Sequence, residues 1–109
     1  MSKYIDKIIS SRQNQAPSPD SLSSGAFSNW LETSKQRLRV LTYPSGYEAD
    51  HTCYDGHAFY IASGQIEIKH DEEVSKWSQG DAFIIPDGIP HLLINPFNED
   101  AKVIVVDHG

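Results

Sequence analysis

The residues of this sequence with the richest chemistry are its five histidines and its single cysteine. Imidazole nitrogen and thiolate sulfur both bind first-row transition metals. His51 and Cys53 stand two positions apart, so an extended strand would put them on one face. His57 shares the parity of Phe59 and Ile61, which would set an imidazole beside inward-facing apolar side chains. What these groups can do depends on the elements that hold them.

Short strands separated by turn residues fill the chain from about residue 27 onward. Residues 65–69 alternate strictly, with Ile66 and Ile68 on one face. The predicted strands are 37–42, 58–62, 65–69, 74–77, 82–85, 91–94 and 102–106. Their near-regular spacing and the lack of a long helical pattern predict an all-β sandwich or barrel.

The first 26 residues depart from this pattern. Tyr4, Ile5, Ile8 and Ile9 are spaced for one face of a short helix, although the same residues could form an edge strand. Residues 10–26 are rich in Ser, Pro, Gln and Asn and offer almost nothing to bury, which predicts an extended, poorly ordered connector. We therefore expect an N-terminal extension and linker over residues 1–26 and one β-barrel domain over residues 27–109.

A run of defined residue types with fixed spacing lies in the second half of the chain. The run is Gly80, five residues, Pro86, one residue, Gly88, two residues, His91, three residues and Asn95. It predicts a tight turn with positive φ available at Gly88. His91 then begins the returning strand on the same side as Leu93. The run matches the second sequence motif of the cupin family at every defined position, so this part of the chain resembles a cupin.

The first cupin motif is present in altered form. In the family it runs Gly, five residues, His-x-His, three or four residues, Glu, six residues and Gly. Here four residues separate Gly46 from His51, Cys53 takes the second His position, and His57 takes the Glu position, with six residues between it and Gly64. The two motifs span about residues 46–95. The resemblance implies a cupin-type double-stranded β-helix, which is a jelly-roll barrel.

The resemblance also implies a metal site. In cupins the two His, the Glu and the later His converge on one metal inside the barrel. Carried over position by position, the ligand set here is His51, Cys53, His57 and His91. A set with a thiolate and no carboxylate favours Zn, Ni, Cu or Fe over Mn or Mg. The plainer alternative is a barrel without metal, in which Cys53 is a small buried hydrophobe.

The cupin resemblance leaves the function open, because this fold hosts many activities. The first hypothesis is an enzyme, such as a metal-dependent dioxygenase or isomerase, that acts on a small organic molecule in the barrel. The alternative is a non-catalytic cupin that binds or senses a metal or a small ligand. A metal-free isomerase with a histidine base ranks last, because no inward acid or Lys–Tyr partner can be assigned.

The other histidines and the tryptophans fit neither motif. His70 stands beside Asp71 in a predicted turn, so we expect a solvated side chain there. His108 is the penultimate residue, where fraying is expected. Trp30 and Trp77 are expected to pack between strands or at a subunit contact.

The composition argues against two classes of binding partner. The 9 Lys and Arg against 15 Asp and Glu give a net charge of −6, with no basic run, which argues against nucleic acid and anionic membranes. No apolar stretch is long enough to span a membrane, and one cysteine cannot form an intramolecular disulfide, so we expect a cytoplasmic protein. Treated as an exposed edge, the apolar segment 103–106 predicts a homodimer, with residues 2–9 reaching the partner.

Overall fold

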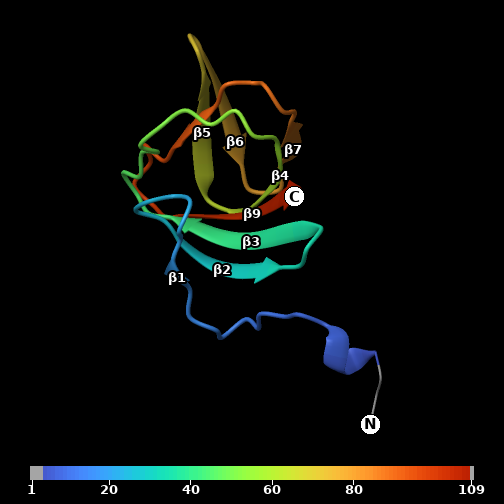
Figure 1. The fold of residues 1–109 in the computed structure, drawn as a ribbon. Helices are drawn as coiled ribbons and strands as arrows, with labels where there is room; N and C mark the ends of the chain where they lie inside the picture. The colour runs from blue at the N-terminus through green and yellow to red at the C-terminus, as the bar shows by residue number, and fades with distance from the viewer. Residues whose placement is uncertain (1–3, 109) are drawn as a thin grey trace.

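Two antiparallel sheets face each other in the computed structural model, which describes residues 4–108 (Figure 1). The larger sheet has the strand order β1-β2-β3-β9-β4-β7, and the smaller has the order β6-β5-β8. The strands are β1 (Ser18–Pro19), β2 (Phe27–Glu32), β3 (Gln36–Tyr43), β4 (His57–Ser63), β5 (Gln65–His70), β6 (Glu73–Ser78), β7 (Ala82–Ile85), β8 (Leu92–Ile94) and β9 (Ala101–His108). The predicted all-β architecture is confirmed.

The seven predicted strands are all present, as β3 to β9. Their alternation is also confirmed, since Phe59 and Ile61 are buried while Tyr60 between them is exposed. The sequence pattern did not predict β2, which pairs with β3 along its whole length. The expectation that residues 103–106 form an edge is wrong, because β9 lies between β3 and β4 and pairs with both. Its apolar character reflects this central position.

The core lies between the facing sheets. The largest fully buried aliphatic side chains there are Leu41, Ile61, Ile66, Ile68, Val103 and Val105. The Phe83 ring stacks on both Phe59 and Trp77, with centroid distances of 4.7 and 3.9 Å. This stack confirms the expectation that Trp77 packs between strands. It closes the barrel on the side of β4, β6 and β7.

The N-terminal segment runs away from the barrel in Figure 1, and its only regular structure from residue 4 to residue 17 is the 3-10 turn η1 (Ile5–Lys7). Of the two alternatives left open for residues 2–9, a short helix or an edge strand, the structure shows one helical turn, with residues 2 and 3 outside the described part. The expectation that residues 10–26 bury almost nothing is wrong for Asp20 and Ala26, which are both buried. Between residues 4 and 108, no helix has the length and apolar character needed to cross a membrane.

Candidate metal centre

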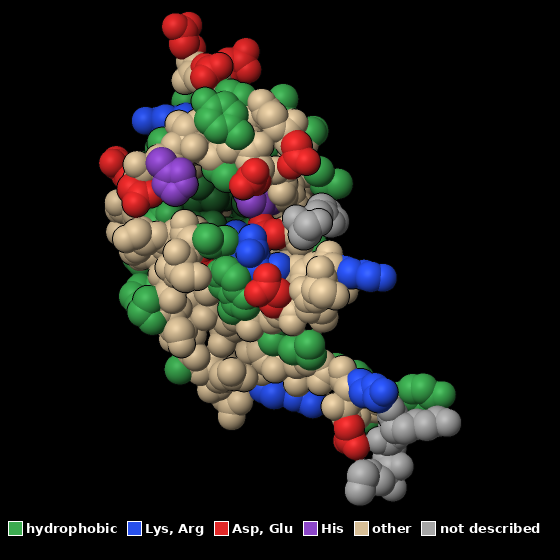
Figure 2. Space-filling model, in the orientation of Figure 1, with side chains coloured by type: hydrophobic (Ala, Val, Ile, Leu, Met, Phe, Trp, Pro, Cys, Tyr) green, Lys and Arg blue, Asp and Glu red, His purple; other side chains and the backbone are tan. Residues whose placement is uncertain are grey.

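A cavity of about 780 Å³ lies between the two sheets. Figure 2 shows it as a hollow with histidine, basic and acidic side chains around it. Part of its wall is apolar and includes Phe59, Leu93 and Val105. As predicted, Leu93 lines the same space as His91. The cavity therefore has an apolar wall on one part of its surface and polar, titratable side chains on another.

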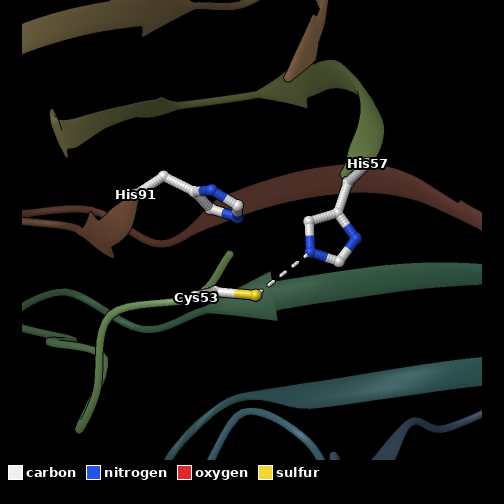
Figure 3. A group of neighbouring side chains, drawn as sticks. All are labelled: Cys53, His57 and His91. Atoms are coloured by element: carbon white, nitrogen blue, oxygen red, sulfur yellow. Dashed lines mark hydrogen bonds between the residues drawn. The ribbon is translucent and has the colours of Figure 1, made fainter. Parts of the chain in front are cut away.

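Three of the four predicted ligands come together in this cavity. Cys53, His57 and His91 each offer one donor atom, and these atoms lie within 4.8 Å of one another. Figure 3 shows the three side chains pointing toward one another. The Cys53 Sγ is 3.6 Å from His57 Nε2, and the rings of His57 and His91 are perpendicular with centroids 5.4 Å apart. The group is tight enough for one ion to contact all three residues.

Backbone pairing explains how Cys53 and His91 meet. The Cys53 N–H donates to the His91 carbonyl at 2.8 Å, and the His91 N–H donates to the Cys53 carbonyl at 3.0 Å. This isolated bridge lies just before β8, so the loop that carries the altered first motif is tied to the strand entry that carries the second. His57 opens β4 and reaches the same space from the larger sheet.

A glycine allows the loop to approach this closely. The Gly56 N–H donates to Asp87 Oδ1 at 2.6 Å, and a Cβ at Gly56 would lie 2.8 Å from the Asp87 nitrogen and the Ile85 carbonyl oxygen. The turn on the other side contains Gly88 with φ +86°, which confirms the predicted positive φ. Its N–H donates to the Tyr54 carbonyl at 2.8 Å. Together these contacts fix the loop against the turn.

His51, the fourth predicted ligand, lies outside the group. Its side chain is 68% exposed, and its Nδ1 is 2.6 Å from Asp50 Oδ1. Residues 50 and 51 form a bend instead of a strand, so the two-residue period that would align His51 with Cys53 does not apply. His51 still lines the cavity, but the structure does not bring it to Cys53, His57 and His91.

Hydrogen bonds select the tautomers of both histidines in the group. The His91 Nδ1 donates to the Ile89 carbonyl at 2.8 Å, because a carbonyl can only accept. Burial lowers the pKa of His91, although the bond to Ile89 opposes this effect. The His57 Nδ1 likewise donates to the Asp107 carboxylate. In the neutral form of each ring, the lone pair therefore lies on Nε2.

A metal ion fits this donor set. The His91 Nε2 is buried and has no hydrogen-bond partner among the described residues, which is costly unless a ligand completes the site. Two imidazole nitrogens and a cysteine sulfur, which ligates as thiolate, match the ligands of zinc and other first-row transition metals. The carboxylate behind His57 is the common outer partner of a metal-bound histidine.

Asp107 is the main functional residue that the sequence analysis missed. It is the cross-strand partner of Arg37 on β3 and of His57 on β4, so the three form one row across the sheet. Its carboxylate accepts from Arg37 Nε at 2.7 Å and from Arg39 Nε at 3.0 Å, as well as from His57. Burial alone would raise the pKa of Asp107, but the bonds from His57 and Arg37 and the charge of Arg39 hold it well below its usual range.

A second carboxylate completes the network behind the row. Arg39 Nη1 donates to Asp20 Oδ2 at 3.0 Å, and both side chains are almost fully buried. The other Asp20 oxygen accepts from Ser28 Oγ at 2.7 Å. The segment before β2 thus supplies a counter-charge to the barrel interior. A sequence signal existed, because Arg37 and Arg39 share the parity of buried Leu41.

Two other predicted positions have structural roles. His70 is not solvated as expected, because it is partly buried, with Nε2 3.0 Å from Ser75 Oγ and Nδ1 3.3 Å from the Pro90 carbonyl. Asn95, the last residue of the second motif, is fully buried. Its amide donates to the carbonyls of Tyr43, Pro44 and Glu99 at 2.9–3.2 Å. Asn95 therefore holds chain segments together and is not one of the residues that line the cavity.

Comparison with known proteins identifies the family. A family model described as the cupin domain matches residues 39–107, which is more than half of the chain. The chain belongs to the cupin family. The fold expected from the two motifs, a cupin-type barrel, is thereby confirmed. No curated protein matches this cupin.

Solved structures share the cupin fold. The polyketide cyclase RemF from Streptomyces resistomycificus is similar with a TM-score of 0.78 and 14% identity, over 93% of this chain and 78% of that one. A Cupin 2 conserved barrel domain protein from Salinispora arenicola has a TM-score of 0.74 and 16% identity, over 91% and 86% of the chains. A sugar phosphate isomerase from Silicibacter pomeroyi has a TM-score of 0.67 and 17% identity, over 78% and 60%. At such identities the likeness shows the fold alone.

Proposed function

We propose that this cupin binds one divalent transition metal through Cys53, His57 and His91, and that a small organic molecule enters the cavity beside it. The observation that carries the proposal is the buried, unpartnered Nε2 of His91, whose donor atom lies within 4.8 Å of those of the other two residues. Zn, Ni, Fe and Cu are the metals that suit this donor set.

An enzyme is the activity that this arrangement supports best, either a metal-dependent oxygenase or an isomerase. Three protein ligands leave coordination positions open, which is typical of catalytic sites, whereas structural sites are closed by four. A bound metal would supply Lewis-acid or oxygen-activating chemistry. His57 and His91 would hold it through Nε2, and the apolar wall with Phe59 and Leu93 would exclude water around a substrate.

The alternative is a non-catalytic cupin that senses a metal or a small ligand in the cytoplasm. The two functions differ in turnover. Oxygen consumption or substrate isomerisation by the metal-loaded protein supports the enzyme, whereas ligand binding without conversion supports the sensor.

Metal content tests the proposed site directly. We expect the purified protein to hold about one metal per chain by elemental analysis, and His91→Ala to lose it, because the remaining pair binds too weakly. His51→Ala is the matched control and should keep the metal, since its side chain is exposed beside Asp50. Loss of metal in His51→Ala would show that His51 is also a ligand, as the sequence predicted. Unchanged metal content in His91→Ala would refute the site.

We also propose a homodimer, formed through the outer face of the larger sheet. Outward side chains on four neighbouring strands form an apolar band in register: Leu38, Val106, Ala58 and Ile84. Ile84 is 75% exposed on the edge strand β7, and Tyr60 on β4 is exposed nearby. Such a patch is typical of an interface in a small soluble domain. A monomer in light scattering at micromolar concentration would refute this assembly.

A further inference from the structure

The cavity contains a buried hydrogen-bond acceptor that has no donor. His91 is 4% exposed, and its Nε2 has no hydrogen-bond partner within residues 4–108. Because Nδ1 donates to the Ile89 carbonyl, the Nε2 of the neutral ring can only accept. Figure 3 shows the ring directed into the space that it shares with Cys53 and His57. A ligand that completes this contact without a metal must therefore bring an N–H or O–H group.

The two basic side chains in the cavity wall are already neutralised. Arg37 and Arg39 both pair with Asp107, with their Nε atoms 2.7 and 3.0 Å from its Oδ2. Arg39 Nη1 is also 3.0 Å from Asp20 Oδ2, and Arg37 Nη1 is 3.7 Å from Glu32 Oε2. Two guanidinium groups thus face three carboxylates, so this part of the wall has no net positive charge to attract an anionic ligand.

Two exposed carboxylates in the cavity wall are not balanced in this way. Asp55 and Asp87 both line the cavity, and neither has an ion-pair partner in the described part of the chain. Burial lowers the pKa of His91, and the charge of Asp55 is one of the smaller effects that oppose it, so the two groups lie within electrostatic reach of each other. The unpartnered acceptor and a negative charge therefore act on the same space, which favours a donor that is also a cation.

We propose that the metal-free cavity binds a small primary ammonium ion with an apolar body, and that this ligand and a metal exclude each other. One ammonium N–H donates to His91 Nε2, and the positive charge faces the Asp55 carboxylate. Phe59, Leu93 and Val105, which line the same cavity, supply the apolar contact for the body. The proposal goes beyond the proposed metal site, because an ammonium ion has no lone pair for a metal and needs the same His91 nitrogen.

Three probes of similar size test the preference for a cation: 2-phenylethylamine, 2-phenylethanol and phenylacetate. At neutral pH they are a cation, a neutral molecule and an anion. In calorimetric titrations of the chelator-treated protein, we expect the amine to bind about tenfold more tightly than the alcohol, because its hydrogen bonds are charge-assisted. Phenylacetate should bind more weakly than the alcohol. Equal affinities, tighter binding of phenylacetate, or no binding of the amine would overturn the proposal.

Asp55→Asn tests the role of the carboxylate. The substitution removes one negative charge and keeps the shape of the side chain, so the affinity for the amine should fall about tenfold while the affinity for the alcohol stays unchanged. Glu72→Gln is the matched control, because it removes one negative charge from an exposed residue outside the cavity. Its affinity for the amine should equal that of the parent protein. Equal losses in the two variants would overturn the site, since the net charge of the protein would then explain the preference.

His91→Leu tests the acceptor. In the folded, metal-free variant, checked by circular dichroism, the affinity for the amine should fall about tenfold, whereas the weak binding of phenylacetate should not fall. If His91→Leu does not fold, the parent protein decides the question. Its ring nitrogen spectrum should then show the Nε2 signal of His91 shifting when the amine is added. An unchanged affinity in the folded variant, or an Nε2 signal that does not shift, would overturn the proposed contact.

Zinc keeps this proposal distinct from the proposed function. With zinc bound, the protein should no longer bind the amine, and rising amine concentration should weaken the apparent affinity for zinc. Equal binding of the amine to the metal-free and zinc-loaded protein would overturn the mutual exclusion. A protein that takes up no zinc but prefers the amine would refute the metal site and support this proposal. A protein that binds zinc but shows no preference for the amine would support the metal site and refute this proposal.

Discussion

The inner faces of the two sheets carry different kinds of side chain. On the three-stranded sheet the inward residues Ile66, Ile68 and Leu93 are apolar and buried. On the six-stranded sheet one inward row carries Arg37, Asp107 and His57 in register across β3, β9 and β4. The stability of the first face depends on close apolar packing, whereas the stability of the second depends on the pairing of its buried charges.

The row of Arg37, Asp107 and His57 lies at one end of the strands, and only β3 extends the charge into the next row, with Arg39 opposite Val105. Two positions away along β9 and β4, the inward residues are Val105 and Phe59, which are both buried and apolar. On β9 and β4, polar side chains therefore occupy the last inward row, and apolar side chains begin at the next. The smaller sheet meets the site only at the entry to β8, where His91 pairs with Cys53.

The largest expected effect comes from breaking the charge network. Arg39→Met leaves Asp20 and Asp107 buried with one partner fewer, so we expect the free energy of unfolding to fall by roughly 3–5 kcal/mol. Urea denaturation followed by circular dichroism measures this loss. Arg12→Met is the control, because Arg12 is exposed, and it should change stability by less than about 0.5 kcal/mol. Equal effects of the two substitutions would show that the network contributes nothing.

A substitution that leaves a cavity in the apolar face should lower the free energy of unfolding somewhat less than the loss of Arg39. It should leave metal binding unchanged. Ile68 is fully buried, so Ile68→Ala should lower the free energy of unfolding by about 3 kcal/mol. The metal content of the folded protein should not change, because Ile68 is not one of the residues that line the cavity. Lys69→Ala, at the exposed neighbouring position, is the control. Loss of metal in Ile68→Ala would contradict the separation of the two faces.

The smallest effects concern the joint between the sheets. Gly64 links β4 to β5 with φ +77°, and a Cβ there would lie 2.6 Å from the Asp100 carbonyl oxygen. Gly46 has φ +83° but nothing within 4 Å. Both Ala substitutions should lower the free energy of unfolding by about 1 kcal/mol, because Ala is strained at positive φ. Gly64→Ala should lower it by about 1 kcal/mol more, because its Cβ clashes with the backbone. Thermal melting of both variants measures the difference, and equal losses would show that the joint is free to relax.

Local patterns were enough to predict the barrel. Strict alternation gave the buried pair Ile66 and Ile68, and the turn chemistry gave the positive φ of Gly88. The second motif predicted that His91 and Leu93 line the same space. These features depend on neighbours in the chain, which a sequence displays directly.

The missing parts of the site depend on distant pairing. His51 misses the group because the chain bends at Asp50, which a two-residue period does not reveal. Asp107 became visible only once β9 was placed between β3 and β4, although its parity with buried Val103 and Val105 was a signal. Asp20 lies in a segment whose composition resembles a linker, and its partners Arg39 and Ser28 are distant in sequence.

The central position of β9 has a consequence for the order in which the molecule folds. Its Asp107 meets Arg37 across 70 residues of sequence and His57 across 50. Closing loops of this length costs entropy before any contact rewards it, and such non-local topologies fold slowly. The pairing of β9 with β3 and β4 can form only after β9 has been synthesised. We therefore expect the centre of the larger sheet and the cavity beside Cys53 to form late and cooperatively.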